Sequence, residues 1–424
     1  MKINIKNQPI IFTNKSFQTI MIKVVFPFSR NDNEIAKLLL LPNLLHYVTA
    51  NYPTEKELVE EFEKNYILNC FCSSNTSGTL SFINFNMVIP NEETLQEDYI
   101  EKQIKILSEI IYNPKIENKA FTKKEFDREL ESLKVNIEKG LKDVNNYAIT
   151  KAKELLDESG LISASIYNHQ DQLETITSEN LYDYYLDKVY NNDPLIYIFG
   201  DIDKEKITNI CNKYIYRKKF KNKQIDYIIR DYFPITELKE KEENSSFHNS
   251  VYITFYKVKD MKREDETKLN LINDLLLSNS SRILSKRLRD DKELVYSTCP
   301  FSYTNYGVLG IASLINKDNI EEVKEETKKA LDDLKNEKII EENLNNIKEE
   351  QRINLLKMLD NKVALFSEKI ICNLKTDISS KEYYDDICKI TPKDIKDFAE
   401  RIVHDTSYFL KEEEHDWFRN SYIR

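Results

Sequence analysis

The five histidines are the side chains that could most readily hold a catalytic metal, and their spacing does not favour one. No two lie three to five residues apart, so no single helical turn can present two imidazoles to one ion; they are His46, His169, His248, His404 and His415. The six cysteines form no CxxC pair. A site assembled from distant histidines stays open, but nothing in the sequence points to one.

Glycine is too scarce for a nucleotide-binding loop. The chain has 6 glycines in 424 residues, against a usual share of about 7%, and they form neither GxGxxG nor GxxxxGK[ST]. A Rossmann or P-loop enzyme is therefore disfavoured. The chain has 62 basic and 72 acidic residues and a net charge of −10. This charge argues against nucleic acid or an anionic membrane surface as the main partner.

The N-terminal segment and the apolar stretches predict a cytoplasmic protein. Met1 to Pro27 lacks a basic start followed by an apolar core and a cleavage site. The most apolar stretch, Ile35 to Leu45, is too short to span a bilayer. We expect a cytoplasmic chain whose cysteines are reduced and mostly buried.

Hydrophobic periodicity predicts strands and helices in the first part of the chain. Lys2 to Phe28 alternates as strands do, and Ile35 to His46 has the strongly apolar face of a helix. The segment "PTEKELVEEFEKNY" (Pro53 to Tyr66) predicts an amphipathic helix with proline in its first turn. Two further strands are expected at Ile67 to Ser73 and Thr79 to Ile89.

The second half of the chain repeats the pattern of the first. Leu173 to Asp203 and Tyr384 to Glu414 each show an Ile-Thr turn, a helix, an Asn/Asp-rich stop and a final apolar strand. Phe121 to Ser159 and Ile340 to Asn373 each predict a long helical hairpin. Two similar α+β halves are therefore expected.

These repeats define the predicted domains. We expect an N-terminal α+β domain over residues 1–215, a linker over 216–249 and a C-terminal α+β domain over 250–424. The linker is placed where the composition becomes charged and polar, because such a segment has little to bury. Each half should contain a mixed, mainly antiparallel sheet packed by helices.

The run "VTANYPTEKEL" (Val48 to Leu58) resembles a segment of the insulinase/pitrilysin-type zinc peptidases, the inverzincins, which include the mitochondrial processing peptidase. In that family a helix carrying H-x-x-E-H precedes this run. Counting back without a gap places the motif's two histidines and glutamate on Leu39, Asn43 and Pro42. Proline in place of the glutamate predicts a bent or broken helix.

The family's remaining zinc ligand is a glutamate on a later helix. In "FDRELESLKVNIEKG" it lies seven residues after Glu129, at Asn136. Leu39, Pro42, Asn43 and Asn136 are therefore degenerate zinc-motif positions. Catalytic zinc needs three protein ligands, so the resemblance implies that this chain binds no metal and has no catalytic residue of its own.

The run "SSRILSKRLRDDKELVYS" (Ser280 to Ser297) is similar to the family segment whose arginine and tyrosine hold and polarise substrate. Here they are Arg289 and Tyr296. A guanidinium and a phenol can both donate hydrogen bonds to a peptide carbonyl and to the oxyanion it becomes. The alternative for Arg289 is a surface ion pair with Asp290 or Asp291.

The resemblance implies a non-catalytic subunit that forms half of a peptidase chamber. A homologous subunit bearing H-x-x-E-H and zinc would complete the chamber and process peptides, with neither nucleic acid nor membrane involved. The strand "ILNCFCSSN" corresponds to the family's edge strand that pairs with an extended peptide, although a plain core strand is an equal alternative. The competing hypothesis is a non-hydrolytic, chaperone-like scaffold in peptide maturation or translation-factor modification.

Overall fold

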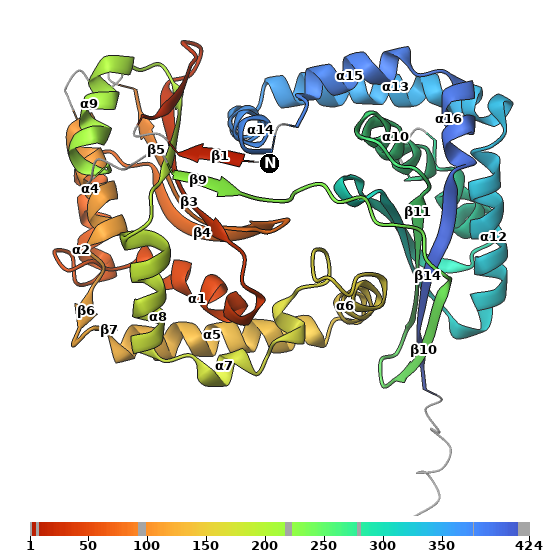
Figure 1. The fold of residues 1–424 in the computed structure, drawn as a ribbon, viewed down its shortest axis with the longest axis horizontal. Helices are drawn as coiled ribbons and strands as arrows, with labels where there is room; N and C mark the ends of the chain where they lie inside the picture. Colours follow the sequence, from red (N-terminus) through yellow and green to blue (C-terminus); the bar gives the residue numbers. More distant parts are fainter. Residues whose placement is uncertain are drawn as a thin grey trace, which may run out of the picture. The chain divides into compact units, whose positions relative to one another are not determined.

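The computed structural model describes residues 2–5, 8–91, 99–216, 223–277, 281–375 and 377–413, and divides the chain into two compact units (Figure 1). The first unit comprises Met1–Glu138, Ser165–Ile229 and Leu365–Lys375, and the second comprises Lys139–Ala164, Arg230–Ala364 and Thr376–Arg424. His415, one of the five histidines, lies outside the described residues.

A five-stranded sheet forms the centre of the first unit. In spatial order its strands are β2 (Ile10–Thr13), β8 (Leu195–Gly200), β3 (Thr19–Ser29), β5 (Leu80–Pro90) and β4 (Asn69–Ser77). β2 runs parallel to β8, and every other pair is antiparallel. β8 is buried along its whole length, as its apolar sequence "LIYIFG" requires.

The sheet of the second unit repeats this topology. Its strands are, in spatial order, β10 (Lys239–Ser245), β14 (Ile402–Glu412), β11 (Ser250–Val258), β13 (Val308–Ile315) and β12 (Val295–Tyr303). Here β10 runs parallel to β14, and the other pairs are antiparallel. The predicted α+β class with two similar halves and mixed, mainly antiparallel sheets is confirmed.

Smaller elements and helices complete the first unit. The two-stranded pairs are β1 (Lys2–Ile5) with β9 (Lys223–Asp226), and β6 (Ile116–Glu117) with β7 (Ala120–Phe121). The helical segments are η1 (Asp32–Glu34), α1 (Ile35–Leu45), α2 (Glu55–Lys64), α4 (Ile100–Tyr112), α5 (Lys123–Leu141), η2 (Ile166–Asn168), α7 (Gln172–Thr175), α8 (Ser178–Tyr185), η3 (Leu186–Tyr190) and α9 (Lys204–Tyr214). α5 enters the second unit at its last residues.

The second unit contains the remaining helical segments. They are α6 (Val144–Leu156), η4 (Arg263–Asp265), α10 (Glu266–Leu277), α11 (Ile283–Ser285), η5 (Lys286–Asp291), η6 (Thr304–Tyr306), η7 (Lys317–Asn319), α12 (Ile320–Asp333), α13 (Glu337–Leu359), α15 (Ser380–Lys389) and α16 (Pro392–Ala399). α14 (Lys362–Lys375) begins in this unit, but its residues from Leu365 onward belong to the first. Among the helices of the described residues, none is long and apolar enough to cross a membrane.

Each sheet has one face covered by a helix from the other half of the sequence. In the first unit, Phe366 and Ile370 of α14 join the core formed by β3, β5 and β8, and Phe366 stacks on Phe199 with ring centroids 5.8 Å apart. In the second, Ala148 and Ala152 of α6 pack against β11 and β14 (Figure 1). The two predicted helical hairpins thus each donate a helix to the opposite unit.

This exchange gives a division of the chain that differs from the predicted boundaries. The boundaries at 215 and 250 treat each half as continuous, whereas residues 139–164 lie in the second unit and 365–375 in the first. The predicted linker over 216–249 contains β9 and β10, because both segments find a strand to pair with in β1 and β14. Residues 217–222 of that linker lie outside the described part.

Truncating Phe366 should destabilise the first unit although the residue lies in the second half of the sequence. Phe366→Ala removes a buried ring, which typically costs about 3–5 kcal/mol. Hydrogen exchange should show lost amide protection in β8 and β3, with β11 and β14 unchanged. Val363→Ala, at an exposed position of the same helix, should leave exchange as in the parent. Equal loss of protection in both sheets would contradict the assignment of α14.

Candidate functional site

The first part of the candidate site is α1, which carries three of the positions that the resemblance matches to the zinc motif. Leu39 and Asn43 are half-buried and Pro42 is buried. The helix runs without interruption from Ile35 to Leu45, so the predicted break at Pro42 is wrong. Pro42 lies in the last turn, and its carbonyl is 2.8 Å from Nδ1 of His46. Proline therefore removes only one backbone hydrogen bond near the end of the helix.

α5 brings the second part of the motif to the same unit. Arg128 lies over the ring of Tyr47 at 5.7 Å, and the charge of Glu129 acts on His46. Burial lowers the pKa of His46, while the hydrogen bond to Pro42 and the charges of Glu129 and Glu55 oppose that shift. α5 thus passes the C-terminal end of α1, as the resemblance implies.

The side chains at the four motif positions do not fit a zinc ion. Leu39 and Pro42 have no donor atom in their side chains, and Asn43 and the exposed Asn136 offer only neutral amides. The described part of the structure contains no cluster of three His, Cys, Asp or Glu side chains that could hold a metal. We therefore derive no hydrolytic step through a metal in this chain.

A cavity of about 480 Å³ adjoins this region in the first unit. Within its wall, Lys115 Nζ lies 3.7 Å from Glu125 and 3.3 Å from the Pro53 carbonyl. It is lined by Tyr47, Val48, Pro53, Thr54, Glu55, Lys115, Glu117, Thr122, Lys123, Lys124, Glu125 and Arg128. This lining contains neither imidazole nor thiol, and its three glutamates do not form a metal-binding cluster in the described part of the structure.

The second unit holds a polar cluster at the positions equivalent to the zinc motif. α10 follows β11 through η4 as α1 follows β3 through η1. Counting from the first residue of each helix matches Leu39, Pro42 and Asn43 to Asn270, Asn273 and Asp274. The same count along α5 and α13 matches Asn136 to Glu350.

Asp274 is the centre of this cluster. Its Oδ2 accepts a hydrogen bond of 2.8 Å from Gln351, and Tyr383 of α15 hydrogen-bonds it as well. Burial, followed by the charge of Glu350, raises the pKa of Asp274 to about 6. The buried Oδ1 of Asn273 has no hydrogen-bond partner among the described residues.

The sequence analysis missed this cluster because it depends on comparing the two halves in space. The available signal was the segment "NLIND" within α10. Asn270, Asn273 and Asp274 interrupt a helix whose other central residues are apolar and buried, with a spacing of three and four that places them on one side.

Arg289 and Tyr296 lie in the second unit, at the entrance to an edge strand. Arg289 is exposed in η5, and Tyr296 is 60% exposed in β12. Neither side chain makes a hydrogen bond or ion pair with a described residue. Asp290, one of the two acids considered as an ion-pair partner for Arg289, instead lies 3.1 Å from Arg282. Both donors thus remain available to a ligand.

A β-bulge sets the direction of Tyr296. Val295 pairs with Ile315 and Ser297 with Leu314, so Tyr296 is the extra residue of β12. A bulge re-aims a side chain at a sheet edge. The side chain of Tyr296 therefore does not follow the regular alternation of β12. One edge of this strand is hydrogen-bonded to β13, and the other edge is the edge of the sheet.

The chain has relatives among inactive peptidases. Residues 175–351 match the family model described as "Peptidase M16 inactive domain". A "Probable inactive metalloprotease YmfF" of Bacillus subtilis is 23% identical over 414 residues, covering 95% of each chain. The predicted resemblance to non-catalytic insulinase-type proteins is confirmed.

Two solved structures share the fold. A conserved protein from Enterococcus faecalis has a TM-score of 0.85 at 21% identity, with 98% of this chain and 99% of that chain covered. The periplasmic protease PqqL from Escherichia coli has a TM-score of 0.66 at 12% identity. The match covers 98% of this chain but 47% of PqqL.

Replacing Asp274 should change how stability depends on pH. Its pKa is about 6 in the folded chain and about 3.9 when unfolded, so the folded state favours the protonated acid. The contribution of Asp274 to the free energy of unfolding is fully present below pH 4. It is lost as pH rises through 6, by up to roughly 3 kcal/mol. In the Asp274→Asn variant, the thermal midpoint should change less between pH 4 and pH 7 than it does in the parent.

Glu350→Gln is the matched variant, because it removes the neighbouring charge and keeps Asp274. It should reduce the pH-dependent change without abolishing it. If the profiles of the parent and Asp274→Asn run parallel, the raised pKa of Asp274 is contradicted.

Proposed function

We propose that this chain, a non-catalytic member of the insulinase-type peptidases, is one subunit of a heterodimeric zinc metallopeptidase. The partner is a homologous subunit that carries H-x-x-E-H and the zinc. This chain is inactive alone. It supplies Arg289, Tyr296 and half of the chamber wall, and the pair encloses and processes peptides.

The observation that supports this proposal is the contrast between the two units. In the first unit the motif positions have lost every side chain that binds zinc. In the second unit Arg289 and Tyr296 are exposed and engage no described residue, although an ion-pair partner for Arg289 lies next to it in sequence. Exposed donors without an internal role suit a ligand from outside the chain.

The chemistry of the pair suits a peptide bond under attack. The Arg289 guanidinium and the Tyr296 hydroxyl can each donate a hydrogen bond to the carbonyl oxygen of the substrate. These bonds strengthen as negative charge develops on that oxygen, which lowers the barrier in the partner's active site. Neither group needs to change its protonation state.

The edge strands support binding of an extended peptide in the first unit. β4 is an edge strand of nine residues, "NCFCSSNTS", without charge or proline, and Phe71 on it is exposed. One edge strand of the other sheet, β10, carries five consecutive charged residues from Lys239 to Glu243. Charge discourages pairing at a sheet edge. β4 is thus suited to add a peptide strand.

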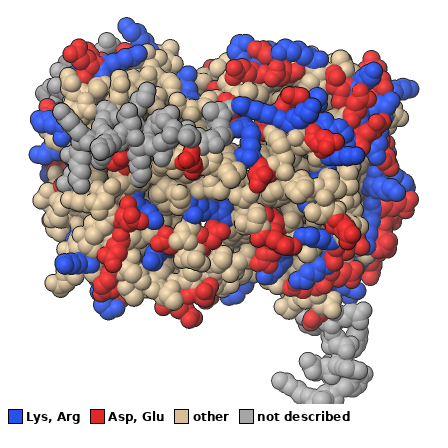
Figure 2. Space-filling model, in the orientation of Figure 1, with Lys and Arg blue, Asp and Glu red and all other residues tan. Residues whose placement is uncertain are grey.

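Pairing with a second subunit is supported by the length of the PqqL protease. This chain covers about half of that chain, so a protease with this fold contains a second body of comparable length. We place the pair in the cytoplasm. The net charge of −10 suits basic peptides, although acidic and basic side chains lie interspersed over the face shown in Figure 2.

The alternative function is a scaffold that binds peptides without hydrolysis. The uncharged edge of β4 favours this alternative equally, because strand addition needs only backbone groups. The contribution of Arg289 and Tyr296 to turnover distinguishes the two.

Metal content should follow the partner. The purified chain alone should contain no stoichiometric zinc, and a complex with an H-x-x-E-H subunit should contain one zinc per heterodimer. Native mass measurement together with elemental analysis checks both. One equivalent of zinc and peptide cleavage by the lone chain would contradict the proposal.

Removing either donor should slow the pair. Arg289→Ala and Tyr296→Phe should each lower kcat/KM by about 10²–10³, the usual effect of one oxyanion donor, without loss of complex formation. Peptide turnover by the reconstituted pair is the measurement.

The controls remove similar groups elsewhere. Arg352→Ala takes away a surface arginine paired with Glu349, and Tyr66→Phe removes the hydroxyl of an exposed tyrosine. Both should leave kcat/KM unchanged. If the Arg289 and Tyr296 variants also match the parent, the scaffold function is favoured.

A further inference from the structure

The carboxylate of Glu326 is nearly inaccessible to solvent, and cations surround it. Its side chain is 3% exposed on α12. It lies 2.9 Å from Lys329 on its own helix, 3.2 Å from Lys292 and 3.4 Å from Arg287. Two of these three cations come from the segment that carries Arg289.

Arg287 and Lys292 bracket Arg289 in the chain. Arg287 lies two residues before it in η5, and Lys292 three residues after it, at the end of the same turn. Arg287 also bonds Asp333, the last residue of α12. The segment that presents Arg289 is therefore held to α12 on both sides.

The backbone between the two donors is fixed as well. The amide of Leu294 donates to the Leu288 carbonyl at 2.8 Å, and Glu293 adopts a left-handed conformation with φ of 54°. Leu288 and Leu294 are buried. A displacement of η5 would consequently be carried through this short turn to the bulge at Tyr296.

We propose that Glu326 is a positioning residue: by holding Arg287 and Lys292 it sets the place of Arg289 and Tyr296. This inference rests on the proposed function of that pair. Glu326 itself touches neither donor and binds no substrate.

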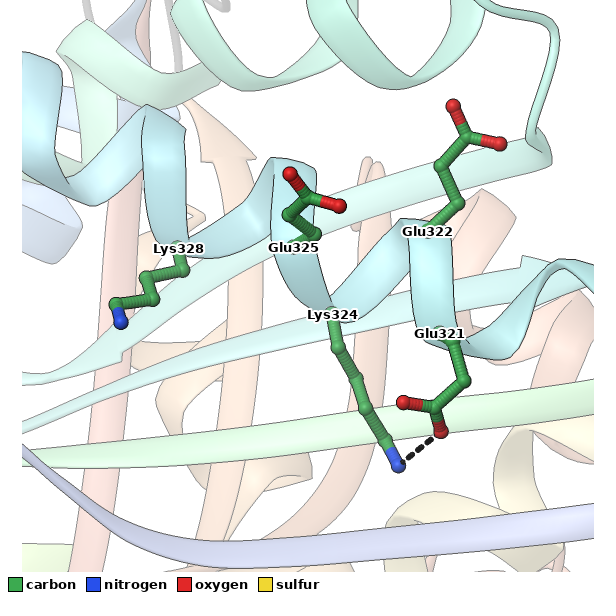
Figure 3. A pocket seen from close by; sticks show the side chains of 5 residues that line it. All are labelled: Glu321, Glu322, Lys324, Glu325 and Lys328. Carbon is green, nitrogen blue, oxygen red and sulfur yellow. Dashed lines mark hydrogen bonds and ion pairs between the residues drawn. The ribbon is translucent and has the colours of Figure 1, made fainter.

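Burial distinguishes Glu326 from the other ion pairs of this region. Glu322, which bonds Lys292, is 50% exposed, and the pair of Arg282 and Asp290 is about 40% exposed on each side. Figure 3 shows Glu321, Glu322, Lys324, Glu325 and Lys328 along α12, with Glu321 paired to Lys324. Glu326 is also shared, since Arg287 and Lys292 both contact its carboxylate, whereas Glu322 contacts Lys292. Removing Glu326 therefore releases both cations of the Arg289 segment from one common anchor.

The test compares Glu326→Gln with Glu322→Gln in the reconstituted pair. Glu326→Gln should lower kcat about 10- to 100-fold and change KM less, because small displacements of a donor act mainly in the transition state. Hydrogen exchange of the variant chain should rise between Leu288 and Val295 while the sheet stays protected. Glu322→Gln should behave as the parent in both measurements.

A double variant separates positioning from general destabilisation. On the Arg289→Ala background, Glu326→Gln should cause less loss than on the parent, because one of the two side chains it positions is already absent. Full additivity would overturn the inference. Should Glu326→Gln fail to fold, Arg287→Gln, which removes a cation from the same carboxylate, decides by the same cycle.

The outcomes also separate this inference from the function on which it rests. If Arg289→Ala lowers turnover and Glu326→Gln matches the parent, the positioning role fails and the proposed function stands. If Arg289→Ala matches the parent, the proposed function fails.

Discussion

A zinc site inside a protein requires ionised or imidazole ligands in a region from which water is largely removed, and such groups are costly to bury without their metal. In α1 the motif positions are Leu39, Pro42 and Asn43, and Leu40, Leu41, Leu44 and Leu45 around them are buried. The helix has thus become an ordinary core element. Its side chains at these positions are apolar or neutral, and the proline lies in the last turn, where it removes one backbone hydrogen bond.

The second unit has polar side chains at the equivalent positions. Its α10 retains Asn273 and Asp274 at the equivalent positions, and α13 supplies Glu350 and Gln351. Here the charge is accommodated by hydrogen bonds and by a raised pKa of Asp274. The two halves therefore share strand order and helix order but not the polarity of this interior position. Topology is set by the sheets and their covering helices, and the equivalent position is free to vary.

Sequence patterns predicted the elements well where a single segment determines them. The helix at Pro53 to Tyr66 forms as α2 between Glu55 and Lys64, because Thr54 and Glu57 make a capping box. The similarity of the two sheets also follows from the repeat. The exchange of α6 and α14 could not be predicted, because both helices have apolar faces that fit either sheet. The cluster around Asp274 required the spatial alignment of the halves, and the freedom of Arg289 depended on Arg282 taking Asp290.

The geometry around Arg289 links these features to the proposed activity. A donor that acts on a partner's substrate must be exposed, yet its position must be fixed, because catalysis depends on groups that are already in place. Exposure and fixation are reconciled by placing the fixed contacts two and three residues away in sequence. Arg287 and Lys292 are bound to the buried Glu326, and the Arg289 side chain between them makes no hydrogen bond or ion pair with a described residue.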